Sequence, residues 1–171
     1  MKISRISVWQ IDLPLHTPYF LSGGRLRFDR LDSTIIRIDT DDGLSGWGEA
    51  CPWGHTYLPA HGPGVRAGLG VLAPCVIGLD PRALDHLNAV MDSMLPGHPY
   101  VKSAIDMACW DIFGQAANMP LWQCLGGHDA TPVAVNSSIS TGTPDEMIDL
   151  IRTASAAGYR THSAKIGGTD I

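Results

Sequence analysis

The sequence predicts an α+β domain followed by the beginning of a second, parallel α/β domain. Three observations support this fold class: strand signals in the first 50 residues, helical periodicity in residues 80–118, and a strand, helix and strand in succession after residue 127. A strand-helix-strand unit requires a parallel sheet, and two strands begin such a sheet without completing it. We therefore expect the first domain to span residues 1–127 and the second, incomplete one to span residues 128–171.

Composition excludes several classes of protein. Hydrophobic residues make up 44% of the 171 residues and charged residues 17%, which is typical of a globular chain with a core. The net charge of −5 and the lack of a basic run exclude nucleic acid as an expected partner. The longest nearly apolar stretch, residues 69–78, is interrupted by Pro74 and is too short to span a bilayer. The N-terminus is too polar for a signal peptide, so we expect a cytoplasmic protein without a membrane partner.

Cysteines and histidines are scattered along the chain. The four cysteines form no Cys-x-x-Cys pair, and no histidine lies at zinc-finger spacing from them. His55 and His61 are the closest histidine pair and have no carboxylate near them in the sequence. The sequence therefore predicts reduced, mostly buried thiols and no metal ligands among these residues.

The first strand is predicted over residues 2–13, where apolar and polar residues alternate. The alternation shifts near Val8, which indicates a bulge or burial on both sides. Residues 14–30 contain two prolines and a Gly-Gly pair and have no period, so we expect a long loop of the kind that often carries function. Tyr19 and Phe20 lie in its middle.

Two further strands, residues 33–40 and 44–50, flank a turn that ends in Gly43. Because glycine can adopt the positive φ of such a turn, these segments predict a hairpin and, with the first strand, a three-stranded antiparallel sheet. Residues 51–64 are too rich in proline and glycine for regular structure and form a second candidate specificity loop. Its ring-bearing side chains include Trp53, His55 and Tyr57.

Helices follow the predicted sheet. One is expected to begin with Asp80 as its N-cap. Residues 100–118 are apolar nearly all round, so we expect this helix to be the central buried one. Glu49 and Asp106 are interpreted as structural hydrogen-bonding groups rather than an acid pair. The tryptophans of the apolar segments, expected in the core, are Trp47, Trp110 and Trp122.

The second domain begins with a strand predicted over residues 132–139. Thr143-Pro-Asp-Glu forms a capping box, with proline in the first turn, for a helix that ends at Gly158. Residues 159–166 form the next strand. The succession predicts one βαβ unit.

Ser163 and Lys165 are the candidate chemical residues of this unit. Residues two apart on a strand point to the same side, so these two share one face, with His162 and Ala164 on the other. We expect His162 to face outward and to pack under a helix, and a Gly-Gly turn at residues 167–168 to follow the strand. A lysine on the interior face of a barrel would be partly desolvated, which favours its neutral form and suits it to act as a general base.

Four segments carry a family resemblance: Gly46-Trp47-Gly48-Glu49-Ala50, residues 104–112, residues 120–127, and Ser163-Ala164-Lys165-Ile166-Gly167. The first three resemble the capping domain of the enolase superfamily, most closely its muconate-lactonizing subgroup. The fourth looks like that subgroup's Lys-x-Lys motif at the end of the second barrel strand. The resemblance implies an α+β capping domain, with a three-stranded antiparallel sheet plus helices, followed by the first βαβ unit of a truncated (β/α) barrel.

The resemblance also implies a chemistry. Lys165 matches the second lysine of the motif and would remove the proton α to a substrate carboxylate. Mg²⁺, held by acidic residues beyond residue 171, would stabilise the resulting enediolate. The substrate would be a small amino acid, and we expect a homo-oligomer. Two loops of the capping domain would close over the substrate and contribute Tyr19, Phe20, Trp53, His55 and Tyr57.

Ser163 departs from the family pattern, which usually has its first lysine there. A serine at this position, together with Pro-Trp-Gly-His-Thr-Tyr in the second loop, is most similar to family members that dehydrate cis-3-hydroxy-L-proline. The implied activity is that of a Mg²⁺-dependent lyase in which Ser163 contacts the substrate, Lys165 transfers a proton and water leaves the neighbouring carbon. Two alternatives stay open: an epimerase or racemase of proline derivatives, dipeptides or N-acyl amino acids, and a non-catalytic capping module if the chain ends at residue 171.

Overall fold

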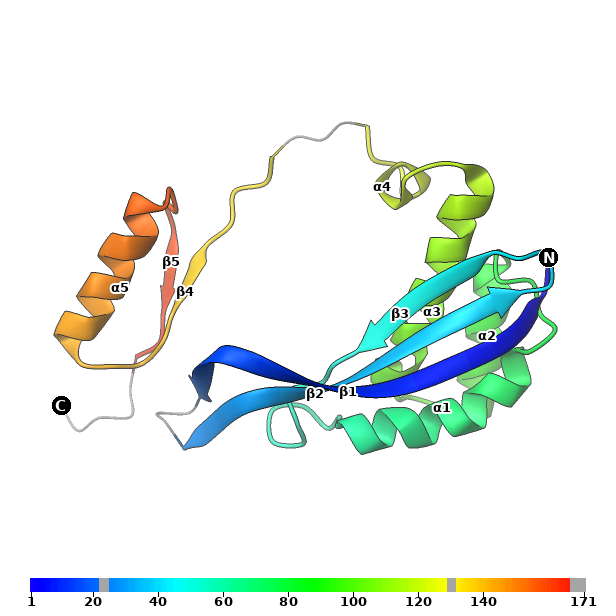
Figure 1. The fold of residues 1–171 in the computed structure, drawn as a ribbon, viewed down its shortest axis with the longest axis horizontal. Helices are drawn as coiled ribbons and strands as arrows, with labels where there is room; N and C mark the ends of the chain where they lie inside the picture. Colours follow the sequence, from blue (N-terminus) through cyan, green and yellow to red (C-terminus); the bar gives the residue numbers. More distant parts are fainter. Residues whose placement is uncertain (22–24, 129–131, 167–171) are drawn as a thin grey trace. The chain divides into compact units, whose positions relative to one another are not determined.

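The computed structural model describes residues 1–21, 25–128 and 132–166. The elements in these residues are β1 (Ile3–Leu21), β2 (Leu26–Thr40), β3 (Ser45–Ala50), α1 (Gly62–Val76), α2 (Leu84–Met94), α3 (Pro99–Ala117), α4 (Leu121–Cys124), β4 (Ser137–Ile139), α5 (Pro144–Ala156) and β5 (His162–Ala164) (Figure 1). The chain divides into two compact units, one made of Met1–Leu13 and Leu31–His128 and the other of Pro14–Arg30 and Asp129–Ile171. The long strands β1 and β2 therefore contribute to both units.

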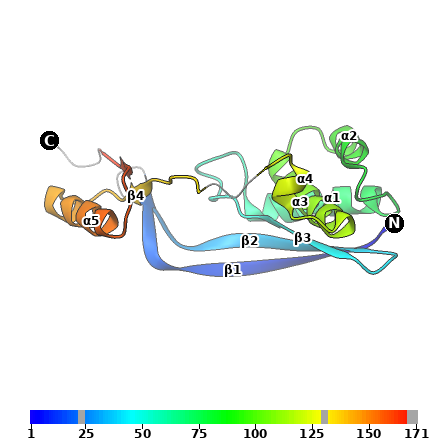
Figure 2. The same ribbon diagram turned by 90° about the horizontal axis from the view of Figure 1, so that it is seen from above.

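A three-stranded antiparallel sheet with the order β1-β2-β3 is one layer of the first unit, and α1, α2 and α3 lie on one of its faces (Figure 2). β2 pairs with β3 from Thr34 opposite Ala50 to Asp39 opposite Ser45. The turn between the two strands contains Gly43, whose φ is 93°. The predicted antiparallel sheet and its glycine turn are confirmed.

The central helix α3 packs with its backbone close to β3. At Gly48 an added Cβ would overlap the carbonyl oxygen of Ala104, and at Gly46 it would overlap that of Ala108. The two glycines thus permit an approach that any side chain would prevent. The buried residues of α3 include Val101, Ala104, Ile105, Ala108, Cys109 and Ile112. The prediction that this helix is the central buried one is confirmed.

Side chains of α3 also bind the free edge of β3. Asp111 Oδ2 accepts the backbone N–H of Trp47 at 2.9 Å, and Gln115 Nε2 donates to the carbonyl oxygen of Ser45 at 2.8 Å. Gln115 Nε2 also donates to Asp111 Oδ1 at 3.0 Å, which links the two side chains. An edge strand leaves backbone groups unpaired, so these contacts satisfy groups that the sheet itself does not.

The prediction of a loop over residues 14–30 is wrong. β1 continues to Leu21 and β2 already begins at Leu26, so most of this segment is a two-stranded extension of the sheet. Pro14 and Pro18 lie within β1, which is an edge strand. An edge strand is hydrogen-bonded to a neighbour on one side only. It tolerates a proline whose missing N–H would face the unpaired side. The Gly-Gly pair that suggested a loop lies outside the described residues.

The helix α1 was not predicted from the sequence. Residues 51–64 are irregular only as far as His61, whose Nδ1 accepts the backbone N–H of Gly64 at 3.2 Å and caps the helix. Four glycines and Pro74 obscure the helical pattern in the sequence. The buried face nevertheless has helical spacing, because it contains Val65, Leu69, Leu72 and Val76.

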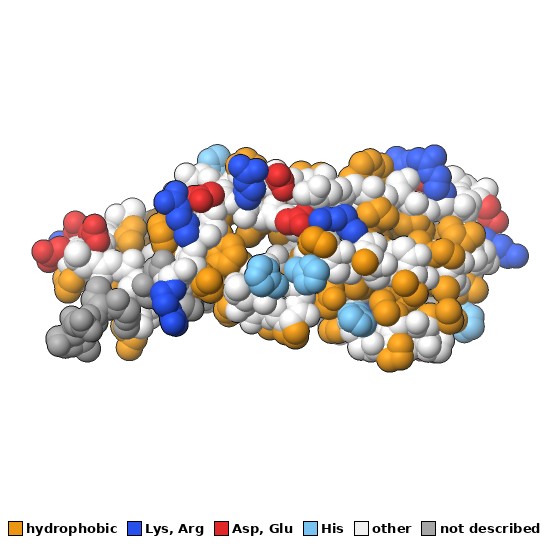
Figure 3. All heavy atoms as spheres, turned by 90° about the horizontal axis from the view of Figure 1, so that it is seen from below, with side chains coloured by type: hydrophobic (Ala, Val, Ile, Leu, Met, Phe, Trp, Pro, Cys, Tyr) orange, Lys and Arg blue, Asp and Glu red, His pale blue; other side chains and the backbone are white. Residues whose placement is uncertain are grey.

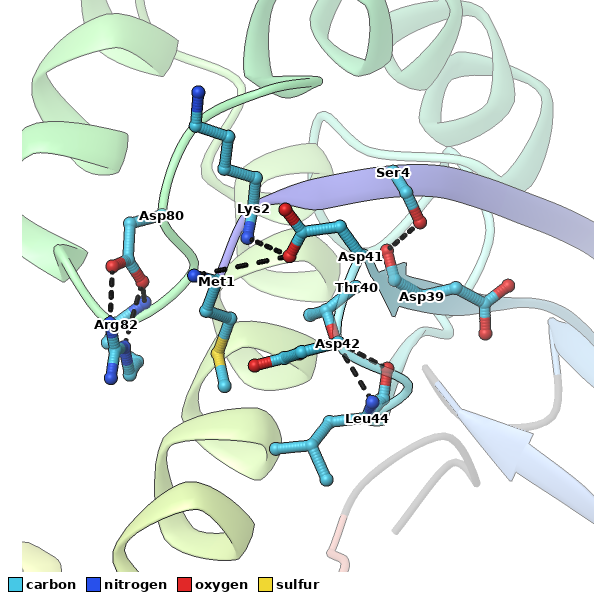
Figure 4. Close-up of polar contacts among 10 residues, drawn as sticks. All are labelled: Met1, Lys2, Ser4, Asp39, Thr40, Asp41, Asp42, Leu44, Asp80 and Arg82. Atoms are coloured by element: carbon cyan, nitrogen blue, oxygen red, sulfur yellow. Dashed lines mark hydrogen bonds and ion pairs between the residues drawn. The ribbon is translucent and has the colours of Figure 1, made fainter.

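The predicted N-cap of α2 is also wrong. α2 begins at Leu84, and its N-cap is Ala83 rather than Asp80. Asp80 instead accepts the backbone N–H of Arg82 at 3.0 Å and a guanidinium N–H of the same residue at 2.7 Å (Figure 4). A turn stabilised by this pair takes the place of the expected first helical turn. The charged guanidinium of Arg82 is a stronger hydrogen-bond donor to Asp80 than a backbone N–H would be.

Replacing Asp80 by asparagine should lower stability in a way that depends on pH. The Arg82 guanidinium lowers the pKa of Asp80 to about 2. Because the folded pKa lies below the unfolded value, the stabilisation is complete above about pH 4 and is lost as the pH falls through about 2. Solvent screening of this partly exposed pair limits the effect to about 0.5–1 kcal/mol. The urea midpoint of unfolding at neutral pH should be lower for Asp80→Asn than for the unsubstituted protein, and at about pH 2 the two midpoints should converge. A pH-independent difference would contradict the assigned cause.

Two of the three tryptophans expected in the core are exposed. The exposed fraction is 50% for Trp47 and 42% for Trp122, while Trp110 is half-buried. Strand alternation explains Trp47, because the flanking glycines of β3 face α3 and Trp47 therefore points to the other side. There it stacks on Trp9, with ring centroids 5.7 Å apart, and the Arg37 guanidinium lies 5.6 Å from its ring.

The second unit contains the predicted βαβ arrangement. β4 and β5 pair in parallel, with Ser138 opposite Ser163, and both are shorter than expected. α5 has the predicted capping box: Thr143 Oγ1 accepts the N–H of Glu146, and Glu146 Oε2 accepts the N–H of Thr143 at 2.8 Å. Gly158 ends the helix with a φ of 100°. The predicted turn at residues 167–168 lies outside the described residues.

Candidate functional site

The second candidate loop, residues 51–61, joins β3 to α1 within the first unit. Trp53 is half-buried, whereas His55 and Tyr57 are exposed, Tyr57 to 60%. A backbone bond of 2.7 Å from the Ala60 N–H to the Leu58 carbonyl turns the chain back toward α1. The loop therefore presents these three ring-bearing side chains near or at the surface.

A polar cluster lies where this loop leaves the sheet and enters α1. Arg66 of α1 donates to both carboxylate oxygens of Asp32, at 2.8 and 3.0 Å, and to Thr34 Oγ1 at 3.1 Å. Beside it, Ser33 Oγ donates to Glu49 Oε1 at 2.5 Å. The Arg66 guanidinium holds the pKa of Asp32 below its usual value.

Asp32 and Arg66 were not predicted as site residues from the sequence. The signal was present, since Arg66 is the one charged residue, histidines aside, between residues 50 and 79. The structural interpretation of the acidic residues is confirmed, because Glu49 bonds to Ser33 and Asp106 accepts from Asn88 Nδ2 at 2.9 Å.

The four cysteines are free thiols. Cys109 is buried in α3, and burial raises the pKa of its thiol to about 12. Burial also raises the pKa of Cys51, at the start of the loop. Cys51, Cys75 and Cys124 are only half-buried, so the expectation of mostly buried thiols holds for Cys109 alone. A thiol with a raised pKa carries little thiolate at neutral pH, so Cys51 and Cys109 are poor nucleophiles.

Tyr19 and Phe20 lie in the second unit, at the end of β1 rather than in a loop. Both side chains are half-buried. The Arg27 guanidinium of β2 lies 5.8 Å from the centroid of the Phe20 ring, at the distance of a cation–π contact. These residues are therefore held by strand pairing, which fixes their direction more firmly than a loop would.

Ser163 and Lys165 lie at the end of the βαβ unit and are both exposed. Ser163 belongs to β5, and Lys165 follows it, with its backbone N–H donating to the Ile139 carbonyl at 3.0 Å. This bond continues the parallel pairing, so alternation places the two side chains on one side of the strand, as predicted. Both residues belong to the second unit, whereas the loop at residues 51–61 belongs to the first.

His162 points away from that side. Its Nδ1 lies 2.6 Å from Ser137 Oγ of β4, and its Nε2 lies 3.1 Å from Ser155 Oγ of α5. Both ring nitrogens are therefore used in holding the strands and helix of this unit together. The prediction that His162 packs under a helix is confirmed.

A groove of about 730 Å³ lies on the first unit and contains none of the predicted site residues. It is mostly apolar, and two of its polar members, Asp111 and Gln115, already bind the edge of β3. The face of the molecule drawn in Figure 3 carries many hydrophobic side chains, with histidines and charged side chains among them. We assign no substrate to this groove, because its lining is mostly apolar and contains none of the predicted site residues.

The described residues do not offer a metal site. Within residues 1–21, 25–128 and 132–166, no three His, Cys, Asp or Glu side chains are grouped so that they could bind one ion. Mg²⁺ prefers several oxygen ligands in octahedral geometry, which this part of the chain does not supply. None of the helices in these residues combines the length and the apolar composition that crossing a bilayer requires.

Comparison with known proteins places this geometry among related enzymes. Residues 6–126 match the N-terminal domain of the mandelate racemase / muconate lactonizing enzyme family. The chain is 46% identical to cis-3-hydroxy-L-proline dehydratase of Roseibium aggregatum, a match covering 98% of this chain and 46% of that protein. It is 30% identical to N-succinyl-L-Arg/Lys racemase of Bacillus cereus, a match covering 98% of this chain and 45% of that protein.

A solved structure gives the same result. A member of the enolase superfamily from Roseovarius nubinhibens ISM, complexed with magnesium, superposes with a TM-score of 0.90 at 69% identity. The match covers 99% of this chain and 45% of that one. The chain thus spans about half the length of the relatives it matches.

Proposed function

This chain belongs to the mandelate racemase / muconate lactonizing enzyme family of the enolase superfamily, and from that premise we propose that it forms part of a dehydratase acting on cis-3-hydroxy-L-proline. The observation that carries the proposal is the 46% identity, over 98% of this chain, to a protein of that activity. The racemase and the epimerases, which match at least as much of the chain, are 30–32% identical. The difference favours elimination of water over epimerisation.

In the proposed reaction, Lys165 Nζ accepts the proton from the carbon next to the substrate carboxylate. The electron pair left on that carbon forms the ring double bond as the bond to the neighbouring hydroxyl breaks, and the hydroxyl leaves as water with the proton that Lys165 Nζ returns. The enamine then takes a proton from solvent at the carbon that lost the hydroxyl and releases its N–H proton, which gives a pyrroline carboxylate. Ser163, on the same side of the strand, contacts the substrate where a second lysine would add positive charge.

The remaining proposed contacts come from the capping domain. Tyr19, Phe20 and His55 would exclude water from the bound substrate. Trp53 or Tyr57 would cover the cyclic secondary amine, whose positive charge favours an aromatic face. These residues fix the orientation of the ring.

We also propose the wider context of the enzyme. Residues 1–127 would be the capping domain and residues 128–171 the start of the barrel, in a homo-oligomer located in the cytoplasm. Mg²⁺ is the proposed cofactor, supported by the magnesium complex of the relative from Roseovarius nubinhibens. We propose that its ligands lie after residue 171, as the resemblance to the family implies.

The proposal is tested by proton NMR of the natural polypeptide that carries this sequence, with Mg²⁺ and cis-3-hydroxy-L-proline in deuterated water. We expect the substrate ring signals to give way to those of a cyclic imine acid. Deuterium at the α carbon with the hydroxyl retained would instead identify an epimerase. That second candidate is favoured by one observation, the 30% identity to N-succinyl-L-Arg/Lys racemase over 98% of this chain.

A non-catalytic module is the remaining alternative. This alternative would be supported if the natural polypeptide has an intact mass near 18.3 kDa and catalyses neither α-proton exchange nor water elimination. It would be excluded if a polypeptide of roughly twice that mass catalyses the elimination.

A further inference from the structure

Both ends of the loop at residues 51–61 meet the same short stretch of β2. At the entry, Ala50 pairs with Thr34, which brings Cys51 beside Ser33. At the exit, Gly62 packs directly against the Asp32 carboxylate, and an added Cβ at Gly62 would overlap that group. The loop therefore has the closed ends of an Ω-loop, and three successive β2 residues lie at its base.

The Asp32–Arg66 pair fixes the exit of this loop. Two parallel N–H···O bonds define the relative orientation of the guanidinium and the carboxylate, which a single bond would leave free. The side chains are 34% and 28% exposed, so water competes only in part. Since Arg66 lies in the second turn of α1, the pair ties the start of this helix to β2.

The start of α1 in turn determines where the loop ends. His61 is both the last loop residue and the N-cap of the helix, through its bond to Gly64. Ala60 before it is buried, at 4% exposure. A shift of the first helical turn would therefore move the end of the loop and, with it, Trp53, His55 and Tyr57.

We propose that Asp32 and Arg66 are a positioning pair that holds the loop at residues 51–61 in the conformation needed to bind substrate. The role in catalysis rests on the proposed function, whereas the conformation of the loop can be measured without it. The two residues contact no substrate themselves. They act through the direction of α1 and the tight contact between Asp32 and Gly62.

The test uses the natural polypeptide with three substitutions. Asp32→Asn removes the negative charge and one of the two oxygens that accept from Arg66. Arg66→Lys keeps the positive charge but removes the planar group that donates two parallel hydrogen bonds. Asp80→Asn is the matched control, because Asp80 makes a similar bidentate contact with Arg82 outside the loop. Hydrogen exchange of the amides of residues 52–61 is followed by mass spectrometry, and kcat and KM are measured with cis-3-hydroxy-L-proline.

We expect the loop amides to exchange at least about tenfold faster in Asp32→Asn and Arg66→Lys than in the unsubstituted protein. Their exchange rate should be unchanged in Asp80→Asn. KM should rise about tenfold in the first two variants with a smaller change in kcat, because the loop binds ground state and transition state alike. Arg66→Lys also serves if Asp32→Asn does not fold. A purely structural pair would change the unfolding midpoint without this split between KM and kcat.

Unchanged loop exchange in both variants would overturn the proposal. Faster exchange with unchanged KM would leave the pair as an anchor of the loop but overturn its role in substrate binding, while the elimination chemistry would stand. If the unsubstituted enzyme does not act on cis-3-hydroxy-L-proline, the proposed function fails, and the exchange data still decide whether the pair holds the loop.

Discussion

Replacing Lys165 by alanine should reduce both α-proton exchange and water elimination at least about a thousandfold. A proton next to a carboxylate is too weakly acidic to leave without a base held beside it. Lys165 follows β5 and shares one side with Ser163, so it is our candidate for that base. Deuterium incorporation at the α carbon of cis-3-hydroxy-L-proline, followed by NMR, measures the loss directly.

The control for this substitution is Ser163→Ala. It removes a hydroxyl from the same side of the strand but no base, so turnover should weaken by a smaller factor and not cease. Circular dichroism should be unchanged in both variants, because both side chains are exposed. Retained exchange in Lys165→Ala would remove this residue from its proposed role and point to a base beyond residue 171.

Replacing Gly48 by alanine should lower the free energy of unfolding by about 3 kcal/mol. The added methyl group would overlap the carbonyl oxygen of Ala104, which belongs to the helix backbone and cannot rotate away as a side chain could. Relief requires α3 to move off the sheet, which opens the core around Ile105. Urea denaturation of the natural polypeptide, with and without the substitution, measures the effect.

Gly70→Ala is the matched control for this second prediction. Gly70 lies in α1, and a Cβ there would meet no atom within 4 Å. Alanine favours the helix, so this variant should be more stable by about 0.5–1 kcal/mol. Equal stability of Gly48→Ala and the unsubstituted protein would show that α3 and β3 are less closely packed than described.

Elements set by local contacts could be predicted from the sequence. The capping box at Thr143 and the turn glycine Gly43 depend on neighbours within a few residues, and both are found where expected. The extension of β1 to Leu21 could not be predicted, because it depends on pairing with β2 across the hairpin. α1 was missed because its glycines lower helix propensity, while its stability comes from a buried face.

The candidate site likewise has features that the local sequence sets and features that depend on contacts between distant residues. Alternation along one strand is local, so the shared side of Ser163 and Lys165 follows from the sequence. The Asp32–Arg66 pair joins residues 34 positions apart and depends on how α1 lies on β2. Trp47 was misplaced for a related reason, since the neighbouring glycines, and not the tryptophan, face α3.

The hydrogen bonds of His162 help to hold β5, the strand that precedes Lys165, against β4 and α5. A serine hydroxyl rotates freely and can either donate to a bare ring nitrogen or accept from a protonated one. Ser137 and Ser155 therefore satisfy the imidazole in either tautomer. The attachment of β5 to β4 and α5 thus does not depend on which ring nitrogen of His162 carries the proton.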